Sequence, residues 1–309
     1  MDKKNFRSVL IMDRKICKFI LNFIPSKSFR KKMRKKNEEI EFKKEIQYID
    51  SEKGKKELNK IEIEFPEVLT TTETLNEILN SGKSISRFGD GELNIVLFKK
   101  SYTPYQILDT KLKKRLIEIL SNGSDEKVLV CIPPFNYKKI KNFQEILKKE
   151  PARFFERYWI KNFNKLKKYF KDNSYGNAFI SRIHFFYDNK LEDIKKVWDN
   201  KNVVLVYSKS GRFEMDKRIF DNIFSYEEIL VPATNAYDKY EDILAECLSK
   251  GKKNIFIIAA GPMATVLAYD LAKKGYQALD IGHFPNCYRE FLGEMPKPEV
   301  LPVIKDQEM

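Results

Sequence analysis

Histidine is scarce in this sequence, whose 309 residues include only His184 and His283. A zinc site built from several histidines is therefore excluded. Cysteine is also rare, and its four copies lie far apart, without the close pairs that metal and redox motifs use. We therefore expect reduced, mostly buried thiols in a cytoplasmic protein, at Cys17, Cys131, Cys247 and Cys287.

Long hydrophobic runs are absent as well. The longest apolar part of the N-terminal region, residues 19–25, is interrupted by Asn22 and falls far short of the roughly 20 residues that a membrane-spanning helix needs. It also lies late for a secretory signal, is broken by charge, and precedes no small-residue cleavage site. The sequence predicts neither a transmembrane helix nor a secreted protein.

Positive charge is abundant but unevenly placed. The formal net charge is +14, and residues 1–36 hold 13 Lys or Arg and 2 Asp, which is +11 of that total. A nucleic-acid enzyme needs its positive charge on the folded body, so we expect no nucleic-acid partner. The basic residues belong to an N-terminal arm.

This arm has the pattern of a helix that lies on an anionic membrane. Apolar residues recur at roughly helical spacing from Phe6 to Ile24 between basic ones, and residues 28–36 are polybasic. Such helices bind anionic headgroups, each surface Lys or Arg contributing on the order of 1 kcal/mol. We therefore expect residues 1–60 to be a basic amphipathic arm and linker, peripherally bound to the inner face of the bacterial membrane. The alternative is that the arm packs on the body or on a partner protein.

From Ile61 onward, short β-branched runs alternate with helical patterns, which is typical of parallel strands joined by helices. The pattern predicts an α/β domain over residues 61–309, with a Rossmann-like, mostly parallel sheet flanked by helices. The predicted strands are 84–88, 127–132, 177–183, 203–207, 228–231, 254–259 and 277–281. The predicted helices are 75–80, 111–120, 137–148, 152–170, 191–198, 237–249 and 263–273.

The segment 86–92, Ser-Arg-Phe-Gly-Asp-Gly-Glu, begins at the end of the first predicted strand and continues past it. An extended or tightly turned backbone would send Asp90 and Glu92 to the same side, where they can share one hard cation, while the flanking glycines let a phosphate approach the main chain. The alternative is that Asp90 caps the next helix. A second D-x-E, Asp50 and Glu52, lies in a Lys/Glu-rich stretch and is expected to be a solvated surface.

Other polar residues also follow predicted strands, and ligands of open α/β sheets gather at the carboxyl ends of strands. Arg182, after Ser181, and Arg212 are candidates for clamping phosphate oxygens. Asn235 is a candidate for a sugar hydroxyl or for shaping a turn. Gly261-Pro262 permits a tight turn that aims helix N–H groups at an anion, with a plain strand-to-helix connection as the alternative.

The two histidines have different surroundings. His184 is flanked by Phe185 and Phe186 and is expected to be packed in the core. His283 follows the last predicted strand, so its ring should face the crevice, where Asp280 could orient it or raise its basicity. No G-x-G-x-x-G or P-loop motif follows any predicted strand, which disfavours a dinucleotide enzyme and a nucleoside-triphosphate hydrolase.

Taken in order, six segments resemble the GT-D glycosyltransferases, a bacterial group once catalogued as a domain of unknown function. The resemblance runs from about Thr71 to Leu292, over residues 85–92, 130–133, 179–182, 235–237, 261–271 and 275–283. It implies a Rossmann-like domain with a nucleotide-sugar donor, typically a UDP-sugar, and a divalent ion, commonly Mn²⁺ with Mg²⁺ as the other option, held by Asp90 and Glu92. The donor would lie against Arg87, Phe88, Gly89, Ser181, Arg182, Arg212, Asn235, Gly261 and Pro262.

We expect the acceptor to be a hydroxyl of a growing surface glycan, with a lipid-linked glycan as one option, whose proton His283 or Asp280 would take. Two segments depart from the family pattern, residues 207–216 and the residues after His283, where the expected acid two positions on is missing. Two other classes stay open: a nucleotide-dependent transferase of another group, such as a methyltransferase, and a scaffold without catalysis that recruits other transferases to the membrane.

Overall fold

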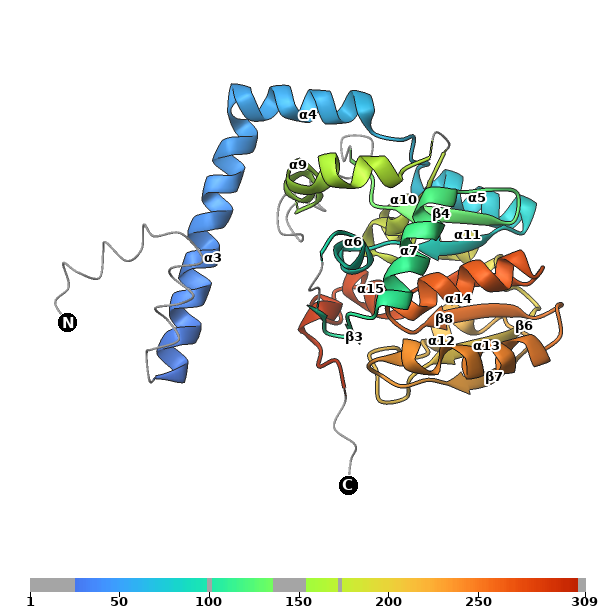
Figure 1. The fold of residues 1–309 in the computed structure, drawn as a ribbon. Coiled ribbons are helices and arrows are strands. Elements are labelled where there is room, and N and C mark those ends of the chain that lie inside the picture. Colours follow the sequence, from blue (N-terminus) through green and yellow to red (C-terminus); the bar gives the residue numbers. More distant parts are fainter. Residues whose placement is uncertain (1–25, 99–101, 136–153, 172–173, 305–309) are drawn as a thin grey trace. The chain divides into compact units, whose positions relative to one another are not determined.

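The computed structural model describes residues 26–98, 102–135, 154–171 and 174–304 (Figure 1). The chain divides into two compact units, and they are described separately. The first contains residues up to Ile63 together with Glu156–Lys161, and the second contains the rest. The predicted helix 137–148 and the arm before residue 26 lie outside the described residues.

The first unit contains two helices, α3 (Lys27–Asp50) and α4 (Glu52–Glu64). The Ser26 hydroxyl accepts a hydrogen bond from the Phe29 N–H and caps α3, as short polar side chains do at helix starts. The first turn of α4 requires glycine at position 54, because a Cβ there would lie 2.0 Å from the Tyr48 carbonyl oxygen of α3. Glu45 binds Arg157 at 2.7 Å and also pairs with Lys161.

The second unit is built on a seven-stranded sheet in the order β5-β4-β1-β9-β8-β6-β7, and every pair in it is parallel. The strands are β1 (Ser84–Arg87), β4 (Val128–Ile132), β5 (Gly176–Asn177), β6 (Asn202–Tyr207), β7 (Ser225–Leu230), β8 (Ile255–Ala259) and β9 (Gln277–Asp280). The expected parallel sheet is confirmed. Its two halves meet between β1 and β9, where Ile85 pairs with Leu279, and open α/β sheets bind ligands at such a switch point.

Helices cover both faces of this sheet (Figure 1). Strand residues of one parity, such as Ile85, Leu129 and Leu279, join a buried cluster with the helices of one face: α5 (Thr71–Ser81), α10 (Ile183–Asp188), α11 (Leu191–Lys195), α12 (Lys217–Phe220) and α15 (Phe284–Phe291). On the other face, α14 packs against β1 and β9 and also contacts α7 and α13. The bounds are α7 (Thr110–Asn122), α13 (Tyr240–Ser249) and α14 (Pro262–Lys273). Burial of both faces explains why the strands are continuous apolar runs.

The remaining elements include a small antiparallel hairpin, β2 (Tyr102–Thr103) with β3 (Gln106–Ile107), which the sequence did not predict. The others are α6 (Asp90–Leu97), α9 (Phe154–Leu166) and the 3₁₀ turns η2 (Lys167–Tyr169), η3 (Ala178–Ser181), η4 (Ala236–Lys239) and η5 (Pro298–Val300). Among the described helices, none is both long and apolar enough to cross a bilayer.

One predicted strand, 177–183, is wrong. Only Gly176 and Asn177 pair with β4, and the chain then turns into η3 and α10. The Asn177 side chain accepts a hydrogen bond from the Phe179 N–H at 2.9 Å and donates one to the Leu69 carbonyl. These bonds compete with the ladder and end the strand.

Candidate active site

The second unit contains a cavity of about 550 Å³ at the carboxyl ends of β1, β4, β6, β8 and β9, here called the carboxyl-end cavity. Ten of the thirteen residues predicted for the site line it: Arg87, Gly89, Asp90, Glu92, Arg182, Arg212, Gly261, Pro262, Asp280 and His283. Residues more than 190 positions apart in the chain thus meet at one edge of the sheet.

Asp90 and Glu92 both lie in the first turn of α6, directly after β1. The expected extended or tightly turned backbone is wrong, and so is the alternative that Asp90 caps the helix. Gly89 occupies the cap position, and the Glu92 carboxylate accepts a hydrogen bond from the Gly89 N–H at 2.8 Å. Glu92 is partly buried and Asp90 is exposed to the cavity.

The surroundings of the Asp90 and Glu92 carboxylates favour the binding of a cation. Removal from bulk water raises the pKa of both groups, while Arg182 beside Asp90 and Arg87 beside Glu92 oppose that rise in pKa. Within the described ranges, no Lys or Arg forms an ion pair with either carboxylate, and no group of three or more His, Cys, Asp or Glu side chains could hold a metal ion. A hard cation here would therefore need further oxygens from a ligand or water, which is common for Mg²⁺ bound to phosphates.

Arg87 is held in place by Asp280. Its Nη2 lies 3.6 Å from the Asp280 Oδ1, and only 2 % of the Asp280 side chain is exposed. Gly282 has φ +47°, and a Cβ there would lie 2.4 Å from Arg87 Nη2. The guanidinium can therefore pack against this turn only because position 282 is glycine. Burial raises the pKa of Asp280 to about 6, against the effect of Arg87. Asp280 is therefore placed to orient Arg87 rather than to reach an acceptor.

The other two arginines contact the C-terminal segment Lys297–Pro302, here called the strap. Arg182 Nη2 binds the Glu299 carboxylate at 2.6 Å. Arg212 is 8 % exposed and donates to the carbonyls of Glu299 and Pro302, each at 3.3 Å. Lys297 and Glu299 both line the cavity. Sequence reasoning missed them because they follow no strand.

His283 precedes α15, and its Nε2 lies 3.3 Å from the hydroxyl of Tyr105 in the β2–β3 hairpin. The Tyr105 hydroxyl also accepts a hydrogen bond from Arg212 Nη1. Burial, and then the positive charge of Arg182, lowers the pKa of His283 well below its usual value, so the ring is neutral. Tyr105 was missed because no strand or motif marked it in the sequence.

Three predicted residues do not line the cavity. Phe88 has no exposed surface and Ser181 is 1 % exposed, so both are part of the core. Asn235 has φ +53°, and its Oδ1 accepts a hydrogen bond from the Ile107 N–H at 2.8 Å, so it supports the hairpin. His184 is packed as expected, with its ring stacked on Phe179 at a centroid distance of 4.3 Å.

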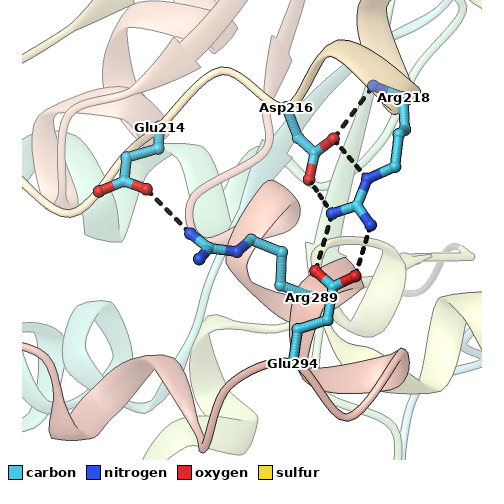
Figure 2. Close-up of polar contacts among 5 residues, drawn as sticks. All are labelled: Glu214, Asp216, Arg218, Arg289 and Glu294. Carbon is cyan, nitrogen blue, oxygen red and sulfur yellow. Dashed lines mark hydrogen bonds and ion pairs between the residues drawn. The ribbon is translucent and has the colours of Figure 1, made fainter.

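Ion pairs join the loop that carries Arg212 to α15 and to the residues just after it, as Figure 2 shows. Arg218 binds Asp216 and Glu294, both at 2.6 Å, and Arg289 binds Glu214 at 2.9 Å. Residues 214 and 216 belong to the segment that departs from the family pattern, and neither lines the cavity. They position the Arg212 loop, in which Ser208, Gly211, Arg212 and Phe213 line the cavity.

The α/β fold and its cavity place this chain among glycosyltransferase folds. A structure described as a new glycosyltransferase (DUF1792) from Streptococcus sanguinis is 31% identical, with a TM-score of 0.63 over 74% of this chain and 85% of that chain. A second, described as domain of unknown function 1792 with a distinct glycosyltransferase fold, is 30% identical, with a TM-score of 0.65 over 77% of this chain and 85% of that chain.

The sequence pattern of the family "Glycosyltransferase GT-D fold" matches residues 85–303, so the chain belongs to the GT-D glycosyltransferase family. Two curated relatives are the probable glycosyl transferase Gly of Streptococcus gordonii, 29% identical over 72% of this chain, and the glycosyltransferase GlyD of Streptococcus pneumoniae serotype 4, 26% identical over 70%. The matches span 33% and 26% of the lengths of these relatives.

Proposed function

We propose that this protein transfers a sugar from a nucleoside-diphosphate sugar, with a UDP-sugar as the expected donor, to a hydroxyl of a growing bacterial surface glycan. The observation that carries the proposal is the carboxyl-end cavity, in which the carboxylates of Asp90 and Glu92 and three arginines face one space. The family membership and the names of the relatives support glycosyl transfer.

The charged groups match the demands of a diphosphate leaving group. Asp90 and Glu92 would hold a divalent ion, Mn²⁺ in the first place and Mg²⁺ in the second, which would neutralise charge on the diphosphate as it departs. Arg182 and Arg212 offer planar forks of donors to phosphate oxygens. Arg87, held by Asp280 at 3.6 Å, presents a third guanidinium to the same space.

His283 is the proposed base for the acceptor hydroxyl. Its ring lines the cavity and is neutral because its pKa is lowered, so a nitrogen lone pair is available. Asp280 is the weaker candidate, since its side chain is only 2 % exposed and is engaged with Arg87.

The test is a thermal-shift titration of the full chain with UDP and UDP-sugars, with and without Mn²⁺. A ligand that binds only the folded state raises the melting temperature by mass action. We expect a rise with UDP and Mn²⁺ together that is lost on addition of EDTA. No shift with any nucleoside diphosphate, with or without metal, would contradict the proposal.

The arm is proposed to hold the enzyme at the inner face of the membrane, near a lipid-linked acceptor. Seven of the first ten residues of α3 are Lys or Arg. Positive charge at a helix N-terminus opposes the helix dipole, so an external anionic surface would stabilise this end. Deleting residues 1–36 should release the protein from sedimented vesicles that contain anionic lipid, and unchanged sedimentation would contradict the assignment.

The family membership leaves a methyltransferase without support. A scaffold without catalysis makes a different prediction: sugar transfer in cells would persist after both Asp90 and Glu92 are neutralised.

A further inference from the structure

The β2–β3 hairpin is tied to the segment after β7 by hydrogen bonds to its turn and to β3. The Asn235 N–H donates to the Tyr105 carbonyl at 2.7 Å, and the Asn235 Oδ1 accepts from the Ile107 N–H at 2.8 Å. The Tyr237 N–H donates to the Gln106 side chain at 3.3 Å. A single asparagine thus bonds the hairpin at two points and fixes where its tip lies.

The tip residue Tyr105 packs over the start of α14. A Cβ on Gly261 would lie 3.0 Å from the Tyr105 Cβ, and the Gly261 φ of +57° already favours glycine. Because Gly261 has no side chain, it leaves room for Tyr105. The Tyr105 ring lies close to Arg212 and His283: the Arg212 guanidinium carbon is 5.3 Å from its centroid, and the His283 ring centroid is 6.0 Å from it.

The three side chains form a hydrogen-bonded series with one direction. Arg212 has only donors, and its Nη1 donates to the Tyr105 hydroxyl. The single hydrogen of that hydroxyl is then free to be donated to His283 Nε2, 3.3 Å away. Hydrogen bonds in series polarise and strengthen one another, whereas an Nε2–H on His283 would put two donors on the same oxygen and leave the hydroxyl hydrogen without this acceptor.

We infer that Tyr105, positioned by Asn235, holds His283 in the neutral form with its proton on Nδ1 and its lone pair on Nε2. Tyr105 and Asn235 are then positioning residues. In transfer, the acceptor hydroxyl would replace the Tyr105 hydroxyl at Nε2, and His283 would take the acceptor proton on that nitrogen. This role in transfer rests on the proposed function, but the tautomer does not. The tyrosine remains protonated at all working pH values because burial raises its pKa to about 12.

The experiment is a nitrogen-15 NMR spectrum of the histidine rings in the full-length protein. The chain has only two histidines, so the ring of His283 can be assigned by its absence in His283→Asn. We expect the Nδ1–H form in the wild type and a substantial Nε2–H population in Tyr105→Phe. Wild-type His283 with its proton on Nε2 would overturn the inference, as would an unchanged tautomer in Tyr105→Phe. Tyr226→Phe is the matched control, because Tyr226 is 51% exposed on the edge strand β7.

Two substitutions separate the Asn235 side chain from its backbone conformation. Asn235→Gly keeps a positive φ readily but removes the Oδ1 acceptor, whereas Asn235→Asp keeps an oxygen there and tolerates this backbone region. We expect the tautomer to shift in Asn235→Gly and to be retained in Asn235→Asp. Equal spectra for these two variants would remove Asn235 from the inference.

Donor turnover gives the link to function. Tyr105→Phe should lower kcat by roughly tenfold, less than the roughly 10²–10⁴-fold that a general base contributes, because the base stays in place and only its tautomer shifts. The KM for the donor should change less than about twofold. A KM effect alone would make Tyr105 a donor contact and overturn its positioning role. If no donor is turned over by the wild type, the proposed function fails, while the tautomer measurement still decides the inference about Tyr105.

Discussion

Two acidic pairs with the same spacing have different surroundings in this molecule. Asp50 ends α3 and Glu52 begins α4, and both are exposed. Asp90 and Glu92 lie in the first turn of α6, after a strand at the centre of a parallel sheet, and both line the carboxyl-end cavity. The spacing is identical, so the surrounding structure makes the difference.

The difference has a physical cause in solvation. Carboxylates on an exposed surface are stabilised by water, and a cation adds little there. In the cavity, loss of water raises the pKa of Asp90 and Glu92, so a divalent ion can replace part of the missing stabilisation. A D-x-E becomes a candidate metal site through its position at the sheet edge.

The largest expected effect compares the two pairs directly. Asp90→Asn with Glu92→Gln should lower donor turnover by about 10²–10³-fold, the range seen when one electrostatic stabiliser is removed. The side-chain amide oxygen introduced at position 92 can still accept a hydrogen bond from the Gly89 N–H, so the fold should persist. Asp50→Asn with Glu52→Gln is the matched control and should retain turnover. Equal turnover in the two double variants would show that Asp90 and Glu92 matter no more to transfer than the exposed pair does.

Asp280 extends the comparison to a more deeply buried carboxylate. Its pKa of about 6 lies above its ordinary value of 3.8, so the folded state binds the proton more tightly than the unfolded state does. The contribution of Asp280 to the free energy of unfolding should therefore fall as the pH rises from about 4 to 6, by about 3 kcal/mol. Compared with the wild type, Asp280→Asn should be relatively more stable at pH 7 than at pH 4. Urea unfolding of both proteins at the two pH values measures this, and a difference independent of pH would be the contrary result.

A substitution of Arg182 tests whether the positive groups of the cavity bind the donor. Arg182→Ala removes a candidate phosphate clamp, and a charge-assisted hydrogen bond contributes about 1.5–3 kcal/mol. We expect UDP with Mn²⁺ to bind at least about tenfold more weakly by calorimetry. Arg115→Ala is the control, because Arg115 pairs with Asp270 on α14 and does not line the cavity. Similar losses in both variants would argue for a general effect of charge.

The smallest effect is expected at the strap. Glu299 pairs with Arg182 at 2.6 Å. Burial raises the pKa of Glu299, but Arg182, a backbone hydrogen bond and His283 together lower it below its ordinary value. A donor phosphate must compete with this carboxylate. Glu299→Gln should therefore tighten UDP binding by roughly two- to fivefold, within the up to about 1 kcal/mol of a partly exposed ion pair. Weaker binding in Glu299→Gln would instead make Glu299 part of the donor site.

Much of the fold could be predicted because strands of a parallel sheet leave strong local signals. Runs such as Val203–Tyr207 and Asn254–Ala259 are β-branched and apolar, since helices cover both faces, and they match β6 and β8 within one residue. The wrong strand at 177–183 is equally apolar, but it lies where the sheet ends. Its conformation depends on the Asn177 side chain and its partners at Phe179 and Leu69, which local composition does not reveal.

Some residues of the candidate site could likewise be predicted from the sequence, and others could not. Residues at or shortly after strand ends, such as Arg87, Gly261 and His283, were found because the strand ends of a parallel sheet share one edge. Arg182 also lines the cavity, although the strand predicted to lead to it ends at Asn177. Tyr105 and Glu299 were missed, since they come from a hairpin and from the C-terminal strap, and reach the cavity only through packing. Phe88 was predicted to touch the donor but has no exposed surface, because adjacent residues on a strand face opposite sides.

The sequence by itself determined the parallel α/β architecture, the polar character of the strand ends and the concentration of positive charge before residue 37, because each is a local property of composition and periodicity. Only the tertiary structure decided which arginine meets which carboxylate, that Asp280 holds Arg87, and that a distant tyrosine and a C-terminal glutamate enter the cavity. These pairings join residues that are far apart in the chain, and the packing of the whole domain sets the distances between them.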